Sequence, residues 1–123
     1  MRKKVLITGI MGQDGAYLAR LLLSKKYKVY GAYRRNSNYE NNRLRKLGIE
    51  DKVELIDLEI NEFTSVNYVI NKIKPDEIYN LAAQSHVAVS FEVPEYTANA
   101  DGIGALRILE AIKFHGFEKK TKF

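Results

Sequence analysis

Short apolar runs alternate along the chain with longer stretches of mixed polarity. Residues 5–7 are uninterrupted aliphatic side chains, which predicts a strand that is buried on both faces. Residues 28–33, 52–57 and 77–83 are three further short runs rich in β-branched, aliphatic and aromatic side chains. We expect each of these runs to form a strand of the same sheet.

The stretches between the expected strands carry apolar side chains at helical spacing. Helices are expected over residues 13–24, 43–47, 62–73 and 94–115. Asn61 is the expected N-cap of the third helix, Pro75 should stop it, and Gly116 should end the fourth. The apolar faces expected to pack on the sheet are Ala16, Leu18, Ala19, Leu21, Leu22 and Leu23, then Phe63, Val66, Val69, Ile70 and Ile73, then Ile103, Leu106, Leu109, Ala111 and Ile112.

Strands that alternate with helices predict an α/β fold. Right-handed crossovers then give a Rossmann-like, doubly wound parallel sheet, here of about four strands with helices on both faces. Ligands of such sheets bind at the carboxyl ends of the strands. We therefore expect a single domain over residues 1–123, with its site in the loops that follow the strands.

Composition excludes several classes of protein. The 123 residues are 46% hydrophobic, but no stretch approaches the roughly 18 consecutive apolar residues of a membrane span. We expect no membrane partner and, because only three apolar residues follow the basic start, no export signal. There is no cysteine, so disulfides, thiolate catalysis and Cys-ligated metals are excluded, and a cytoplasmic location is expected.

The net charge of +5 favours an anionic partner, which could be a nucleotide, a sugar nucleotide or a nucleic acid. The basic residues are dispersed along the chain, and no signature of an RNA- or DNA-binding motif accompanies them. We therefore expect a small anionic ligand and no nucleic acid.

Three glycines spaced three apart follow the first expected strand. Gly9 permits a tight turn, Gly12 lets a pyrophosphate approach the backbone, and Gly15 lets the next helix lie close to the sheet. The N–H groups of that helix then face an anion. A glycine-rich turn with a purely structural role is one alternative, and the P-loop alternative lacks its Gly-Lys-Ser/Thr ending. The position after a strand and before a helix favours a dinucleotide site.

Two arginines stand where the second strand ends. An acidic residue there would bind the ribose 2′-hydroxyl of NAD, whereas Arg34 and Arg35 would attract the 2′-phosphate of NADP. Asn36 and Ser37 can add hydrogen-bond donors to the same phosphate. The alternative is a solvated end of a strand, but the position beside the glycines favours NADP.

The third strand ends on Asp57, close to the expected position of an adenine. Asp57 can accept from the adenine amine while Leu58 packs on the ring, although an aspartate that caps its own loop is the alternative.

Two pairs of residues could suggest catalysis, but the sequence favours a structural interpretation of each. Ser85 and His86 follow the fourth strand, but a lone histidine there is more often structural and no acid adjoins it. Tyr68 and Lys72 have the Tyr-x-x-x-Lys spacing of short-chain dehydrogenases. They precede the fourth strand, whereas that chemistry needs the pair beyond the fifth, so we expect a helix surface.

Several motifs occur together in a characteristic order. They are Thr-Gly-Ile-Met-Gly-Gln-Asp-Gly-Ala-Tyr-Leu over residues 8–18, Arg-Arg-Asn-Ser over 34–37, Leu-Ala-Ala-Gln-Ser-His-Val over 81–87 and Glu-Tyr-Thr-Ala over 95–98. With them the chain resembles the GDP-mannose 4,6-dehydratase family of extended short-chain dehydrogenases, over nearly its whole length. Met11 and Ala105 depart from the resemblance, since threonine is common at both positions.

The resemblance implies a set of cofactor-binding residues. Residues 9–14 would bind the pyrophosphate, residues 34–37 the 2′-phosphate region, and Asp57 with Leu58 the adenine. The implied residues are Gly9, Ile10, Met11, Gly12, Gln13, Asp14, Arg34, Arg35, Asn36, Ser37, Asp57, Leu58, Leu81, Ala82, Ala83, Gln84, Ser85 and Tyr96, of which the last six would line the rest of the cofactor path.

Members of this family are much longer chains. Their Ser/Thr, Glu, Tyr and Lys catalytic group follows a fifth strand, whose beginning residues 122–123 resemble. The resemblance therefore implies the amino-terminal part of the NADP domain, with no catalytic residue, no metal site and no substrate domain in these residues. It also implies a homo-oligomer.

For the intact family the resemblance implies a lyase. GDP-mannose is oxidised at C4 with hydride passing to NADP, water is lost across C5 and C6, and the hydride returns to C6 to give GDP-4-keto-6-deoxymannose. Residues 1–123 alone should give no turnover. The alternatives are a related NADP-dependent nucleotide-sugar epimerase or reductase, and a non-catalytic dinucleotide-binding module.

Overall fold

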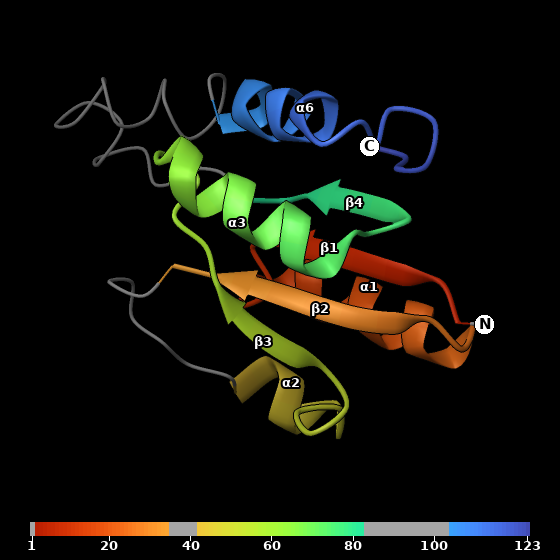
Figure 1. The fold of residues 1–123 in the computed structure, drawn as a ribbon. Coiled ribbons are helices and arrows are strands. Elements are labelled where there is room, and N and C mark those ends of the chain that lie inside the picture. Colours follow the sequence, from red (N-terminus) through yellow and green to blue (C-terminus); the bar gives the residue numbers. More distant parts are fainter. Residues whose placement is uncertain (1, 35–41, 83–103) are drawn as a thin grey trace, which may run out of the picture.

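In the part of the chain that the structure describes, four parallel strands form a sheet. The computed structural model describes residues 2–34, 42–82 and 104–123. The strands are β1 (Lys4–Thr8), β2 (Lys28–Tyr33), β3 (Glu54–Asp57) and β4 (Glu77–Asn80). Their order in the sheet is β3-β2-β1-β4, and in Figure 1 all four arrows point the same way. This order places the first strand inside the sheet, as a doubly wound fold requires.

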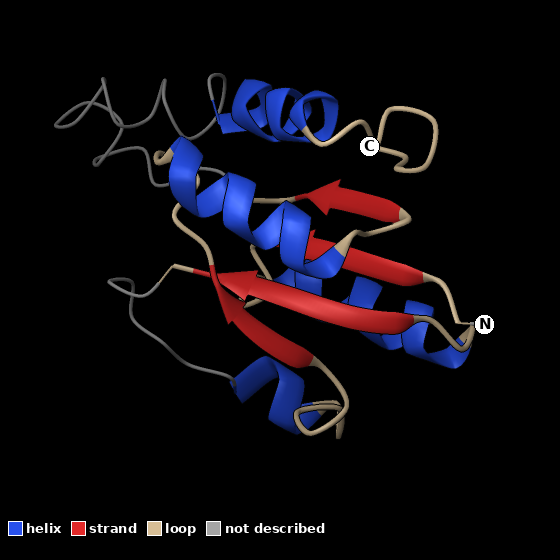
Figure 2. Ribbon diagram, in the orientation of Figure 1, coloured by secondary structure: helices blue, strands red, loops and turns tan. Residues whose placement is uncertain are grey.

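Helices cover both faces of this sheet. They are α1 (Gln13–Ser24), α2 (Asn42–Lys46), α3 (Phe63–Ile73) and α6 (Gly104–Phe114). Figure 1 shows α3 in front of the sheet and α1 behind it, and Figure 2 shows the same layers by type of element. The Rossmann-like, doubly wound α/β fold expected from the sequence is confirmed.

The side chains of β1 point alternately into two separate clusters of the core. Val5 and Ile7 face α1 and α2, whereas Leu6 between them faces α3 and α6. All three side chains are fully buried. A strand covered on both faces cannot carry polar side chains at either set of positions, which explains its uninterrupted aliphatic run.

The parallel register brings the ends of the strands together. Thr8 pairs with Ala32 of β2 and with Asn80 of β4, and Tyr33 pairs with Asp57 of β3. The segments that follow all four strands therefore leave the sheet at one edge, where the sequence predicts the site.

The outer edge of β4 is met by the last described residues. Lys122 forms an isolated parallel bridge with Glu77: Ile78 N–H donates to Lys122 O at 2.7 Å, and Lys122 N–H donates to Asp76 O at 2.9 Å. This pairing agrees with the likeness of residues 122–123 to the beginning of a fifth strand.

Some boundaries and faces differ from the expectations. The third and fourth strands are shorter than the predicted 52–57 and 77–83, and Glu62, not Asn61, stands at the N-cap of α3. Of the expected helix over 94–115, residues 94–103 lie outside the described residues. The expected core residues Leu21, Phe63, Leu106 and Leu109 are exposed, because only one stripe of each helix reaches the sheet.

No helix in the described ranges combines the length and apolar character needed to span a membrane.

Candidate functional site

The turn after β1 is built from backbone packed against backbone. Gly9 has a φ of +69°, which L side chains rarely adopt, and a Cβ there would lie 2.8 Å from the carbonyl carbon and oxygen of Leu81. The N–H of Gly12 donates to Gly9 O at 3.0 Å and closes the turn. The loop after β4 can therefore lie directly on this turn only because residue 9 has no side chain.

Gly15 allows α1 to begin against the same turn. A Cβ at this position would lie 2.5 Å from Gly9 O and 3.0 Å from the Cα of Ile10. The sequence predicted that this glycine lets the helix lie close to the sheet; in the structure it lets the helix lie close to the turn that leaves β1.

The amino terminus of α1 is open and uncapped. Gly12 is the N-cap, no side chain caps the helix, and the first intrahelical bond runs from Ala16 N–H to Gly12 O at 3.1 Å. Gly12, Gln13 and Asp14 are all exposed. The first N–H groups of a helix lack intrahelical acceptors and carry the positive end of its dipole, so this terminus can hold an anion.

Gly12 provides a test of whether a diphosphate fits. Among the described residues, and apart from its two chain neighbours, a Cβ there would have one neighbour within 4 Å, Gly9 O at 3.3 Å. As far as the described residues go, the absent side chain thus leaves room at the helix terminus, as the approach of a diphosphate requires.

The side chain of Ile10, which the sequence predicts to belong to the cofactor site, lies in the protein core. Its side chain is fully buried, and its N–H donates to Ala32 O at 3.2 Å. Because the side chain and the N–H are both occupied within the fold, they anchor the turn to β2. A direct contact of Ile10 with a cofactor stays a prediction.

Gly31, which the sequence analysis did not select, makes room for Ile10. A Cβ on Gly31 would lie 2.6 Å from Ile10 Cγ1. A glycine inside a predicted strand signals such a close approach, so the signal was present in the sequence.

Thr8 is a second residue that the sequence analysis did not select. Its hydroxyl donates to Asn80 Oδ1 at 2.6 Å and accepts from Ala82 N–H at 3.0 Å, while the residue is 1% exposed. Thr8 thus fixes the segment that leaves β4. Leu81 is exposed at this edge, and Ala82 is half-buried.

Arg34 directly follows β2, at the edge that holds the glycine turn, and is partly exposed. Leu58 N–H donates to Tyr33 O at 2.8 Å, so the segment after β3 lies beside the end of β2. Leu58 is 6% exposed and belongs to the core cluster with α3 and α6. Burial in that core limits the surface that Leu58 could offer to an adenine ring, and this contact stays a prediction.

The structure brings together part of the predicted site. The turn residues, Arg34, Asp57, Leu81 and Ala82 lie at the carboxyl edge of the sheet. The predicted site residues outside the described ranges are Arg35, Asn36, Ser37, Ala83, Gln84, Ser85 and Tyr96.

The Tyr68 and Lys72 pair lies on the surface of α3, as expected. Tyr68 is 63% exposed, and Lys72 Nζ stands 5.8 Å from the centroid of its ring. Within the described residues no group of three His, Cys, Asp or Glu side chains could hold a metal ion.

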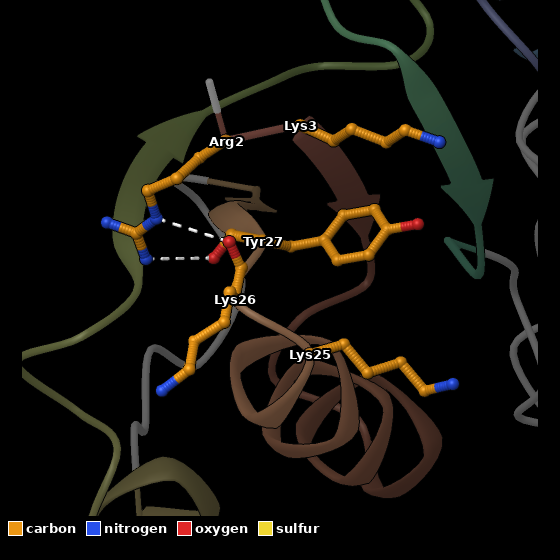
Figure 3. Close-up of a pocket in the computed structure, with 5 residues that line it drawn as sticks. All are labelled: Arg2, Lys3, Lys25, Lys26 and Tyr27. Atoms are coloured by element: carbon orange, nitrogen blue, oxygen red, sulfur yellow. Dashed lines mark hydrogen bonds between the residues drawn. The ribbon is translucent and has the colours of Figure 1, made fainter.

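A hollow lies at the opposite end of the sheet, where the strands begin. It measures about 540 Å³ and is lined by Arg2, Lys3, Lys25, Lys26 and Tyr27 (Figure 3). The Arg2 guanidinium donates to Lys26 O at 3.2 Å and to Tyr27 O at 3.1 Å, which ties the two segments together. None of the predicted site residues lines this hollow, so the candidate site is the glycine edge.

The sequence is similar to those of known proteins. The family model described as GDP-mannose 4,6 dehydratase matches residues 6–123. The chain is 48% identical over 128 residues to a GDP-mannose 4,6-dehydratase of Vibrio cholerae, covering 100% of this chain and 34% of that protein. It is 46% identical to the GDP-mannose 4,6 dehydratase of Homo sapiens, covering 99% of this chain and 34% of that protein. The chain therefore spans about a third of the length of these relatives.

Among solved structures, the Bordetella bronchiseptica enzyme WbmH in complex with NAD⁺ superposes with a TM-score of 0.75 and 25% identity. The match covers 95% of this chain and 37% of that one.

Proposed function

The chain belongs to the GDP-mannose 4,6-dehydratase family, and on that premise we propose that residues 1–123 form the NADP-binding part of such an enzyme. The observation that carries the proposal is the open, uncapped start of α1 at Gly12, beside the end of β2 where Arg34 stands. A helix terminus for a diphosphate and a guanidinium for a further phosphate together suit NADP. The complex of WbmH with NAD⁺ supports a dinucleotide as the ligand.

We assign the following roles to the residues of this chain. The turn from Gly9 to Asp14 would hold the diphosphate, and Arg34, with Arg35, Asn36 and Ser37, would hold the 2′-phosphate. Asp57 would accept from the adenine amine, beside Leu58. The remaining residues of the proposed cofactor path are Leu81, Ala82, Ala83, Gln84, Ser85 and Tyr96.

The reaction proposed for the whole protein is that of a lyase, which converts GDP-mannose to GDP-4-keto-6-deoxymannose. When bound, the nicotinamide supplies a site that accepts a hydride from the sugar and later returns it. The residues described above bind and orient the cofactor, and none of them is proposed to move a proton. We therefore expect residues 1–123 alone to give no turnover.

The proposal extends to assembly and location. The exposed Leu106 and Leu109 of α6 support a homo-oligomer, because a second copy would remove these apolar side chains from water. We propose a cytoplasmic location on the absence of cysteine, and no nucleic acid as a partner.

Calorimetric titration of the protein with NADP and with NAD tests the cofactor. We expect tighter binding of NADP, and equal affinities would remove the role of the arginines. Incubation of the full-length protein with GDP-mannose and NADP tests the reaction, with the keto sugar as the expected product. An epimerised sugar would instead favour the nucleotide-sugar epimerase alternative, and cofactor binding without any product would favour a non-catalytic module.

A further inference from the structure

An arginine outside the predicted site reaches the glycine turn. Arg43 Nη1 donates a hydrogen bond to the carbonyl oxygen of Met11 at 2.8 Å. The two residues are 32 positions apart in the chain, so the contact depends on how α2 lies against the turn. Hydrogen bonds from a charged guanidinium are stronger than those between neutral groups.

This contact completes a clamp on one peptide group. The Met11–Gly12 peptide accepts from Arg43 through its carbonyl, and it donates to Gly9 O at 3.0 Å through the Gly12 N–H. A peptide plane bonded at both polar atoms cannot rotate without breaking one of the two bonds. Because Gly12 is the N-cap of α1, this plane orients the backbone at the helix terminus proposed to hold a diphosphate.

Helix α2, which carries Arg43, is anchored in the protein core. Leu44, the next residue of α2, is 1% exposed and packs in the same core cluster as Ile10. Arg45 Nε pairs with Glu50 Oε2 at 2.9 Å at the other end of this short helix. Arg43 itself is exposed, so its guanidinium reaches the turn from the solvent side and its removal leaves the core intact.

We infer that Arg43 is a positioning residue, which holds the Met11–Gly12 peptide in the orientation that receives a diphosphate. The inference rests on the proposed function, because it concerns the same turn. Since the guanidinium acts through a backbone carbonyl and not through the 2′-phosphate, it should favour phosphorylated and unphosphorylated dinucleotides equally. Its contribution is to fix the turn before the ligand arrives.

The test uses the full-length protein and its Arg43→Met variant, which keeps an unbranched apolar stem and loses every donor. Calorimetry is done with ADP-ribose and with its 2′-phosphorylated form. Loss of one charge-assisted hydrogen bond should weaken both ligands by roughly tenfold. Lys46→Ala is the matched control, because it removes one positive charge from an exposed position of the same helix and should leave both affinities unchanged.

A second readout follows the peptide itself without any ligand. Hydrogen exchange of the Gly12 amide should be faster in Arg43→Met, and unchanged in Lys46→Ala. Arg43→Lys, which retains a charged donor, should recover part of the protection. If Arg43 only attached α2 to the fold, Arg43→Met would lower the unfolding temperature. The exchange rate of the Gly12 amide and the ligand affinities would then stay as in the wild type.

The outcomes separate the two proposals. Wild-type protein that binds neither ligand would contradict the proposed function, while Gly12 exchange would still decide whether Arg43 holds the turn. Wild-type affinities in Arg43→Met, or a loss confined to the 2′-phosphorylated ligand, would overturn the positioning role.

Discussion

Thr8 in β1 and Asn80 in β4 are joined side chain to side chain at the carboxyl edge of the sheet. Thr8 Oγ1 donates to Asn80 Oδ1 at 2.6 Å, and the same oxygen accepts from Ala82 N–H at 3.0 Å. One hydroxyl therefore satisfies groups on a strand and on the loop that follows it. This arrangement holds the loop after β4 against the glycine turn.

Replacing Thr8 with valine should destabilise the fold. The Thr8→Val variant keeps the shape of the side chain, but it leaves Asn80 Oδ1 and Ala82 N–H without their partner. The two hydrogen bonds have half-buried partners and are together worth about 1–3 kcal/mol, which should appear as a lower midpoint in urea unfolding. Thr8→Ser keeps the hydroxyl and should lose much less. Equal losses for the two variants would show that the methyl group, and not the hydroxyl, is what matters.

Alanine at Gly15 should disrupt the turn even though alanine favours helices. Helix propensity favours alanine over glycine by about 1 kcal/mol, but its Cβ would approach Gly9 O to 2.5 Å. Gly9 O is a backbone atom and the Cβ position is fixed by the helix backbone, so the clash exceeds the propensity gain and the variant should unfold at lower urea. An unchanged or raised midpoint would contradict the close packing of α1 on the turn.

Gly12→Ala provides the contrast. Its Cβ would approach Gly9 O to 3.3 Å, a tight contact but a much milder one than at Gly15, so the unfolding midpoint should fall less than in Gly15→Ala. The added methyl group would occupy the space in front of the helix terminus, and we expect dinucleotide affinity to fall by roughly tenfold or more. Calorimetry checks this result, and wild-type affinity would place the diphosphate elsewhere.

The sequence was sufficient to predict the order of strands and helices. The aliphatic run of residues 5–7 specifies a strand covered on both faces, and the three glycines specify the turn and the start of α1. Both signals are local, since they depend on spacing within a few residues. Parallel strands then leave few arrangements, which explains why the position of the site was also predictable.

The partners of individual side chains were not predictable in the same way. The contact of Thr8 with Asn80 spans 72 positions, and the contact of Arg43 with Met11 spans 32. Neither has a local signature, because each depends on which segments the folded sheet brings together. Leu106 and Leu109 show a second limit, since helical spacing identifies apolar positions but does not say which of them the neighbouring elements will cover.

Removing the charge of Arg34 should change cofactor preference. If its guanidinium binds the 2′-phosphate, Arg34→Ala should weaken NADP by roughly tenfold or more and leave NAD nearly unchanged. Titration calorimetry with both dinucleotides measures the ratio. Arg20→Ala is the control, because it removes one positive charge from an exposed position on α1. The Arg20 guanidinium lies over the Tyr17 ring, 5.2 Å from its centroid. A parallel loss of both dinucleotides in Arg34→Ala would contradict a role in discrimination.

Asp76 should make the stability of the protein sensitive to acid. Hydrogen bonds from Lys120 Nζ and from the N–H of Lys4, both at 2.8 Å, lower the pKa of the Asp76 carboxyl below its ordinary value of 3.8. The folded state therefore favours the ionised form. Its stabilisation is fully present above the ordinary pKa and is lost as the pH falls through the lower pKa of the folded state.

The Asp76→Asn variant measures this contribution, because asparagine keeps an oxygen for Lys4 N–H but cannot pair with a charged Lys120. At neutral pH it should be less stable than the wild type by about 1 kcal/mol or less, as expected for an ion pair near the surface. The difference in urea midpoints should shrink as the pH falls from about 5 to about 2. Asp51→Asn, which neutralises an exposed carboxylate before β3, should show no comparable pH-dependent difference. A difference in urea midpoint that stays constant over this pH range would contradict the prediction. It would mean that asparagine fits the site poorly and that the charge of Asp76 does not contribute to stability.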